Sequence, residues 1–155
     1  MSLSLDAMAR PKILLATAGS DDLAEPALEV AKRDNASLVV SFVRDVALNY
    51  RVNAENVLTL ENDRAAQELF TDFLEHGHHA GVPIIPMYDT GNDASVLIAE
   101  GAAMNGVSKV LIGSSRRGAL HNLIKGSFQR RLESLLPPDV AVEVITAPAK
   151  LEPVL

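Results

Sequence analysis

A strand, a loop and the start of a helix follow one another in Ser108-Lys-Val-Leu-Ile-Gly113-Ser-Ser-Arg-Arg-Gly-Ala-Leu-His-Asn-Leu-Ile-Lys-Gly-Ser127. The part up to Gly113 is a short, largely apolar run, which is typical of a parallel strand covered on both faces. The Gly126-Ser127 turn predicts the start of a helix that ends before Pro137. A strand followed by a helix in this way is the repeating unit of an α/β fold.

The same alternation of short β-rich runs and longer helical patterns extends along the chain. The other predicted strands are Lys12–Thr17, Ser37–Val43, Val82–Asp89 and Val140–Thr146. Pro83 and Pro86 have no amide hydrogen for a strand ladder, so the third strand is expected at an edge of the sheet. The pattern predicts a single open, doubly wound, five-stranded parallel sheet of the Rossmann-like type, in strand order 3-2-1-4-5, with helices on both faces.

Three further helices are predicted between the strands. They span about 23–33, 61–79 and 93–105. Asp22 and Glu25 are spaced as a capping box for the first, and Asn92 or Asp93 caps the third. The residues expected to face the core are Ala66, Leu69, Phe70 and Phe73 in the second helix and Val96, Ala99 and Ala103 in the third.

Residues 45–60 fit neither the strand period nor the helix period. This long connection leaves the carboxyl end of the second predicted strand. In folds of this kind, ligands bind outside the carboxyl ends of the strands. The connection is therefore either a lid over a ligand or a simple surface excursion.

The length and composition fit one globular domain. The chain has 155 residues, of which 48% are hydrophobic. A chain of this size buries about 68–70% of the surface that its unfolded form exposes, so it needs no disulfide or metal to fold. We expect a domain over 11–148, a preceding segment over 1–10 that is disordered or a remnant of cloning, and a tail over 149–155.

The charge of the chain is unevenly distributed. There are 14 basic and 20 acidic residues, for a formal net charge of −6. Five of the basic residues and no carboxylate lie between Gly113 and Leu132, so this stretch is basic and the remainder is acidic. Nucleic-acid-binding proteins usually carry a basic domain or a basic stripe with interleaved aromatic residues, whereas Phe128 is the only aromatic residue in this stretch. The composition therefore argues against a nucleic-acid partner.

The absence of cysteine excludes a disulfide framework, a cysteine-ligated zinc site and thiol catalysis. No stretch approaches the roughly 18–20 apolar residues of a membrane-spanning helix. The first residues lack the basic and apolar segments of a secretion signal. We therefore expect a soluble protein of the cytoplasm.

The loop between Gly113 and Ser127 has the chemistry of an anion site. Its glycines let backbone amides approach a phosphate, Ser127 can donate a hydroxyl hydrogen bond, and the helix N-terminus favours negative charge. Arg117 and Lys125 add positive charge. The alternative is a glycine-containing loop whose cations are simply solvated. Two other phosphate motifs are absent, because the first strand-to-helix turn has one glycine and the G-x4-G spacing from 113 to 118 lacks the following Lys-Ser/Thr.

Over 11–146 the sequence resembles the universal stress protein family. That family has the motif G-x2-G-x9-G-[ST] between its fourth strand and fourth helix, where the glycines and the hydroxyl hold the phosphates and ribose of ATP. The spacing is reproduced here by Gly113, Arg116, Gly126 and Ser127. Val110-Leu-Ile-Gly113 and the Ala-Leu of Glu25-Pro-Ala-Leu28 also look like the family.

The resemblance implies a regulatory domain that binds ATP or AMP at the carboxyl edge of the sheet and hydrolyses ATP slowly at most. By resemblance, Thr17, Ala18 and Gly19 border the base and ribose, and Val43 offers backbone groups to the adenine edge. By resemblance, the phosphates face Gly113, Arg116, Gly126 and Ser127. Arg117 and Lys125 join this set on charge alone.

Two positions depart from the family pattern. Arg116 replaces the second glycine of the motif, where its side chain either crowds the nucleotide or reaches a phosphate itself. Ala18 stands where ATP-binding members usually have an aspartate that meets the adenine, and the lost hydrogen bond is worth about 1 kcal/mol. The alternative is therefore a dimerising or transporter-tethered regulatory module that has lost adenine binding and keeps at most an anion site.

A histidine cluster gives a competing enzyme hypothesis. In Glu75-His-Gly-His-His79, His76 and His79 are spaced to share one helical face as metal ligands. No distant residue is indicated that would complete the metal shell. Histidines placed favourably near the C-terminal dipole of a helix are the simpler interpretation, so we predict no metal site and no catalytic residue.

The last predicted strand, Val140–Thr146, suggests a partner surface. An edge strand of this kind can pair with a second copy across a two-fold axis, and universal stress proteins are often similar homodimers through this strand. Glu143 interrupts the apolar run and, alternatively, discourages pairing. Family domains also occur fused behind membrane transporters, and the tail over 135–143 looks like those variants, which would place the chain on the cytoplasmic face of a membrane.

Overall fold

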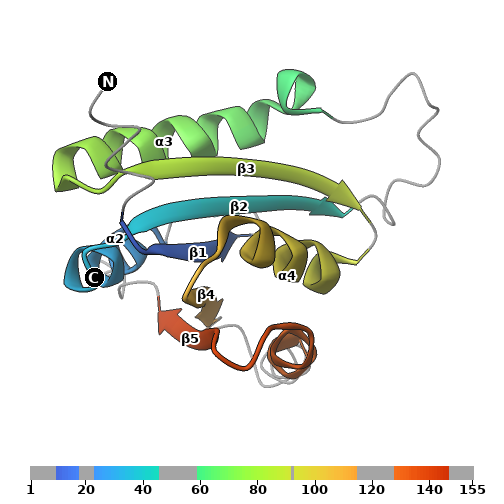
Figure 1. Ribbon diagram of the computed structural model, residues 1–155. Coiled ribbons are helices and arrows are strands. Elements are labelled where there is room, and N and C mark those ends of the chain that lie inside the picture. The colour runs from blue at the N-terminus through green and yellow to red at the C-terminus, as the bar shows by residue number, and fades with distance from the viewer. Residues whose placement is uncertain (1–9, 18–22, 46–58, 92, 115–127, 147–155) are drawn as a thin grey trace, which may run out of the picture.

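The computed structural model describes residues 10–17, 23–45, 59–91, 93–114 and 128–146 of the chain, with strands and helices in alternation (Figure 1). The strands are β1 (Lys12–Thr17), β2 (Ser37–Asp45), β3 (Ile84–Gly91), β4 (Lys109–Ser114) and β5 (Ala141–Thr146). The helices are α2 (Ala24–Arg33), α3 (Arg64–Ala80) and α4 (Ala94–Asn105), with a 3-10 turn, η3 (Leu60–Asn62), before α3. Residues 128–135 are also helical.

The described strands are parallel and lie in the order β3-β2-β1-β4-β5. This confirms the predicted doubly wound sheet, including the edge position of the strand that contains Pro86. Strand order reverses between β1 and β4, so the topological switch point lies there. Ligands of such sheets bind outside the carboxyl ends of the strands at this point.

Hydrophobic side chains cover both faces of the sheet. On one face, α2 and α3 pack on Ile13 and Leu15 of β1. On the other face, α4 and the helix over 128–135 pack on Leu14. All three leucine and isoleucine side chains of β1 are fully buried. Successive residues therefore enter two different cores, which is why the predicted strand is so continuously apolar.

The predicted core face of α3 is confirmed, whereas that of α4 is wrong by one position. The expected residues of α3 are all at most 5% exposed: Ala66, Leu69, Phe70 and Phe73. In α4 the core residues include Ile98 and Ala102, while Ala103 is exposed and Val96 and Ala99 are only partly buried. Apolar residues occur nearly all round α4, so their spacing does not single out one face.

The start of α2 agrees with the predicted start near Leu23, whereas the start of α3 differs from the predicted one. The N-cap of α2 is Leu23, which makes no side-chain cap bond. The predicted capping box involves Asp22, which lies outside the described residues. The helix α3 starts after Asp63 rather than near Glu61, because η3 precedes it.

Three other predicted ends are confirmed, whereas the predicted start of the last helix at Gly126-Ser127 lies outside the described residues. Asp93 caps α4 by accepting from the amide of Val96 at 3.4 Å. The helices α3 and α4 end at Gly81 and Gly106, whose φ angles of 73° and 62° are left-handed and favour glycine. None of the helices that the structure describes combines the length and the apolar character needed to cross a membrane.

Candidate functional site

Thr17, Val43 and Gly113 lie at the carboxyl edge on neighbouring strands, β1, β2 and β4. Thr17 pairs with Phe42, the residue before Val43. Ala16, the residue before Thr17, pairs with Ile112, the residue before Gly113. The structure therefore brings these three candidate residues to the same level of the sheet, on both sides of the switch point.

The peptide groups of Val43 point toward β1. The amide of Ser37 in β2 donates to a carbonyl on the β1 side at 2.8 Å, whereas that of Leu38 donates to one on the β3 side at 2.9 Å. The side to which the peptide groups point alternates from one residue to the next along a parallel strand. Val43 is six residues after Ser37, so its peptide groups also point toward β1. The pairing between β1 and β2 ends at Thr17. Since the pair of Thr17 and Phe42 is the last of this ladder, the Val43 carbonyl points past the paired part of β1.

Gly113 is closely covered on the α2 side. An ideal Cβ at this position would lie 2.5 Å from Cδ1 of Leu23, the N-cap residue of α2. Glycine therefore leaves room for the Leu23 side chain over the end of β4. This packing role is independent of any ligand and stands beside the predicted phosphate role.

The other candidate site residues lie outside the described part of the chain. They are Ala18, Gly19, Arg116, Arg117, Lys125, Gly126 and Ser127. Most of the predicted lid, residues 46–58, lies outside it as well. At the end of that connection, the amide of Thr59 donates to Oδ1 of Asn62 at 2.7 Å, which closes a capping box on η3.

Charged groups of both signs flank the carboxyl edge. Asp93 forms an ion pair with Arg131, one of the clustered basic residues, and this hydrogen bond holds the pKa of Asp93 below its usual value. Asp89 of β3 is the register partner of Val43. Burial, and then the charge of Glu100, raises the pKa of the Asp89 carboxyl group. Asp89 therefore lies next to Val43 on the β3 side of this edge, whereas the chain after β4 enters the basic stretch.

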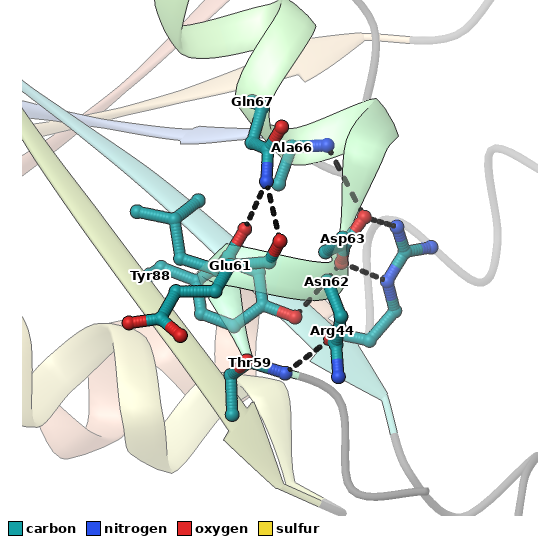
Figure 2. Close-up of polar contacts among 9 residues, drawn as sticks. Arg44, Thr59, Glu61, Asn62, Asp63, Ala66, Gln67 and Tyr88 are labelled. Atoms are coloured by element: carbon teal, nitrogen blue, oxygen red, sulfur yellow. Dashed lines mark hydrogen bonds and ion pairs between the residues drawn. The ribbon is translucent and has the colours of Figure 1, made fainter.

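A polar cluster that the sequence did not indicate joins β2, β3 and α3 at the same edge (Figure 2). Asp63 caps α3 by accepting from the amide of Ala66 at 3.2 Å. Its carboxylate also accepts two hydrogen bonds from Arg44, at 2.7 and 2.9 Å, and one from the Tyr88 hydroxyl at 2.8 Å. The Asp63 side chain is 3% exposed. We call these four residues the Asp63 cluster.

Aromatic rings and charge hold the Asp63 cluster together. The rings of Phe42 and Tyr88 stack with centroids 5.9 Å apart, and the Arg44 guanidinium carbon lies 4.9 Å from the Phe42 centroid. Hydrogen bonds from Arg44, and then from Tyr88, hold the pKa of Asp63 below its usual value. Burial, and then the hydrogen bond to Asp63, raises the pKa of Tyr88 to about 12. At neutral pH the cluster therefore contains a carboxylate, a guanidinium and a neutral phenol.

A second ion network lies at the opposite, amino edge of the sheet. Lys109, at the start of β4, contacts Asp34 at 3.0 Å and Glu143 of β5 at 3.1 Å. Arg33, at the end of α2, contacts Asp34 and Glu143 at 3.2 Å each. Hydrogen bonds from Lys109, and then from Arg33, hold the pKa of Glu143 below its usual value. The negative charge of Glu143, which interrupts the apolar run of β5, is therefore balanced by Lys109 and Arg33.

The histidines of α3 do not come together with other ligands in the part of the chain that the structure describes. No group of three or more His, Cys, Asp or Glu side chains there could hold a metal ion. Nδ1 of His76 lies 2.7 Å from the carbonyl oxygen of Asp72 in the same helix. The rings of His78 and His79 contact each other edge to face, with centroids 5.9 Å apart.

Comparisons with known proteins place this site in context. The model of the universal stress protein family matches residues 10–142. A solved universal stress protein in complex with cAMP is 14% identical, with a TM-score of 0.61 over 90% of this chain and 99% of that one. The Archaeoglobus fulgidus universal stress protein in complex with dAMP is 14% identical, with a TM-score of 0.57 over 87% and 98%. An Arabidopsis thaliana universal stress protein family protein with AMP bound is 17% identical, with a TM-score of 0.55 over 90% and 93%. No curated protein sequence matches significantly.

Proposed function

The chain belongs to the universal stress protein family, and from this premise we propose that it is a regulatory domain that binds ATP or a related adenine nucleotide at the carboxyl edge of its sheet. The proposal rests on the placement of Thr17, Val43 and Gly113 on neighbouring strands at the switch point. Three proteins of the same fold were solved with cAMP, dAMP and AMP, which supports an adenine nucleotide as the ligand class.

In this proposal the base lies toward β2 and the phosphates lie beyond β4. Val43 offers its peptide groups to the adenine, and Thr17, Ala18 and Gly19 border the base and ribose. The phosphates meet Gly113, Arg116, Gly126 and Ser127, with added charge from Arg117 and Lys125. The order of charges along the sequence supports this direction, because the basic stretch follows β4, whereas Asp89 is the register partner of Val43.

The proposed role is binding, with ATP hydrolysis slow at most. No His or Asp is positioned by the sequence to activate Ser127 as a nucleophile. We place the domain, over about 11–148, in the cytoplasm or on the cytoplasmic face of a membrane, where attachment to a transporter would make it a regulatory module.

The proposal includes a homodimer through β5. This strand forms an edge of the sheet, and Val144 on it is 45% exposed. Arg33 and Lys109 compensate the charge of Glu143, so this residue does not oppose pairing with a second copy. Light scattering should give twice the chain mass of 16.6 kDa, and a mass of one chain would reject the dimer.

Thermal unfolding with ATP, AMP and tripolyphosphate tests the nucleotide proposal. A ligand at about 100 times its dissociation constant stabilises the folded state by about 2.7 kcal/mol, which raises the Tm of a domain of this size by roughly 5–10 °C. We expect such a shift with ATP and with AMP. A shift with tripolyphosphate alone would favour the anion-binding module that has lost adenine recognition, and no shift with any of the three would reject a phosphate-binding role altogether.

A further inference from the structure

We propose that the Asp63 cluster is a positioning device for adenine recognition, which fixes the carboxyl end of β2 and thereby the peptide groups of Val43. Its residues act on the bound base through the backbone and do not touch it. This inference rests on the proposed function, because Val43 is the proposed adenine contact.

Arg44 directly follows Val43 in β2. Successive side chains of a strand leave on opposite faces of the sheet. Val43 packs on the core under α4, whereas Arg44 reaches Asp63 on the α3 side. Two parallel hydrogen bonds between a guanidinium and a carboxylate restrict both groups to one geometry. The bond therefore ties the end of β2 to the first turn of α3.

The strand β2 loses one of its two strand partners at this point. Its pairing with β1 ends at Phe42, whereas its pairing with β3 continues through Val43 and Arg44 to Asp45. Strand ends with fewer partners open more readily than strand centres. The Asp63 cluster therefore restrains the end of β2, where pairing with β1 no longer does so.

Asp63 accepts hydrogen bonds from groups of β2, β3 and α3. Tyr88 donates to it from β3 and the Ala66 amide from α3, while the Arg44 guanidinium also lies over the Phe42 ring. Since the Asp63 side chain is 3% exposed, water competes little for these bonds. A displacement of the β2 end would break the arginine pair or the helix cap, so one backbone position is strongly preferred.

The variants Arg44→Met and Arg44→Lys test the proposal by calorimetric titration. Methionine removes the charge and both hydrogen bonds, whereas lysine keeps the charge and can keep one bond. We expect the Kd for AMP to rise about threefold to thirtyfold in Arg44→Met, with partial recovery in Arg44→Lys. The Kd for tripolyphosphate should stay the same, since the phosphates lie beyond β4. The matched control Arg33→Met removes an arginine pair at the amino edge and should leave both affinities unchanged.

Hydrogen exchange gives a readout that does not need ligand. The segment around Val43 should exchange faster in Arg44→Met and in the milder variant Tyr88→Phe, which removes one hydrogen bond and keeps the ring. If Arg44→Met does not fold, the comparison of Tyr88→Phe with the wild type decides the question. Wild-type affinity for AMP in the folded variant, or an equal loss for AMP and tripolyphosphate, would overturn this inference and leave the nucleotide proposal standing. A wild type that binds no adenine nucleotide would overturn both.

Discussion

Replacement of Asp63 by alanine should lower the free energy of unfolding by about 3 kcal/mol. The substitution leaves the Arg44 guanidinium, the Tyr88 hydroxyl and the Ala66 amide without their common acceptor. Removing one partner of a buried ion pair costs about 3–5 kcal/mol and the loss of an N-cap costs about 1 kcal/mol. Because Arg44 is 32% exposed, water relieves part of that cost. Urea denaturation, with an unchanged m-value, measures the difference.

Asp93→Ala is the matched control for this prediction. Asp93 also caps a helix and also pairs with an arginine, but its side chain is 39% exposed and that of Arg131 is 54% exposed. Water can replace these bonds, so the loss of stability should be clearly smaller. Equal losses in the two variants would show that burial does not set the strength of the Asp63 cluster.

The stabilisation from Asp63 should also depend on pH. The hydrogen bonds from Arg44 lower the pKa of Asp63 in the folded state, so that the unfolded state binds more protons between the folded and unfolded pKa values. The contribution is therefore complete above the unfolded pKa of about 4 and is lost as the pH falls through the folded pKa. Asp63→Asn should lack this part of the acid destabilisation in unfolding curves measured below about pH 5. If Asp63→Asn lost as much stability at low pH as the wild type, the lowered pKa of Asp63 would be contradicted.

Gly77→Ala should destabilise the chain by about 1–3 kcal/mol, although alanine is the better helix former. An ideal Cβ at this position of α3 would lie 2.3 Å from Cγ1 of Ile84 and 2.8 Å from the carbonyl oxygen of Val82. The carbonyl belongs to the backbone and cannot rotate away, so α3 would have to move off the start of β3. Thermal or urea unfolding measures the loss.

Gly101→Ala in α4 is the corresponding control. Its ideal Cβ would lie 2.2 Å from Cε of Met87, which is the far end of a flexible side chain. Methionine can adopt another rotamer, and alanine gains about 1 kcal/mol in helix propensity. We therefore expect stability near that of the wild type. A Gly77→Ala variant as stable as Gly101→Ala would contradict the close contact between α3 and β3.

The fold was predictable because its strands are buried on both faces. Ile13, Leu14 and Leu15 serve two cores in turn, and such a run between helical patterns has few other interpretations. The exact face of α4 was not predictable, since its apolar residues leave no polar stripe to mark the solvent side. The start of α2 near Leu23 was predictable, although Leu23 makes no side-chain cap bond there.

Only the part of the candidate site that is formed by residues close together in the sequence was predictable. The spacing from Gly113 to Ser127 is local, and the register then places Gly113 beside Thr17 and Val43. In the Asp63 cluster, Arg44 and Tyr88 lie 19 and 25 positions from Asp63 along the chain. Their meeting depends on strand register and on the start of α3, which no local pattern specifies. The one local signal was an aspartate before a helical pattern.

The most direct test of nucleotide binding at the predicted motif is calorimetric titration of the wild type and Gly126→Arg with ATP. Gly126 is proposed to face the phosphates, so an arginine side chain there should block their approach. Ala103→Arg is the control, because it adds the same side chain at an exposed position of α4. We expect the wild type and Ala103→Arg to bind ATP and Gly126→Arg to bind none. ATP binding by Gly126→Arg with wild-type affinity, or no binding by the wild type, would contradict a nucleotide site at the carboxyl edge.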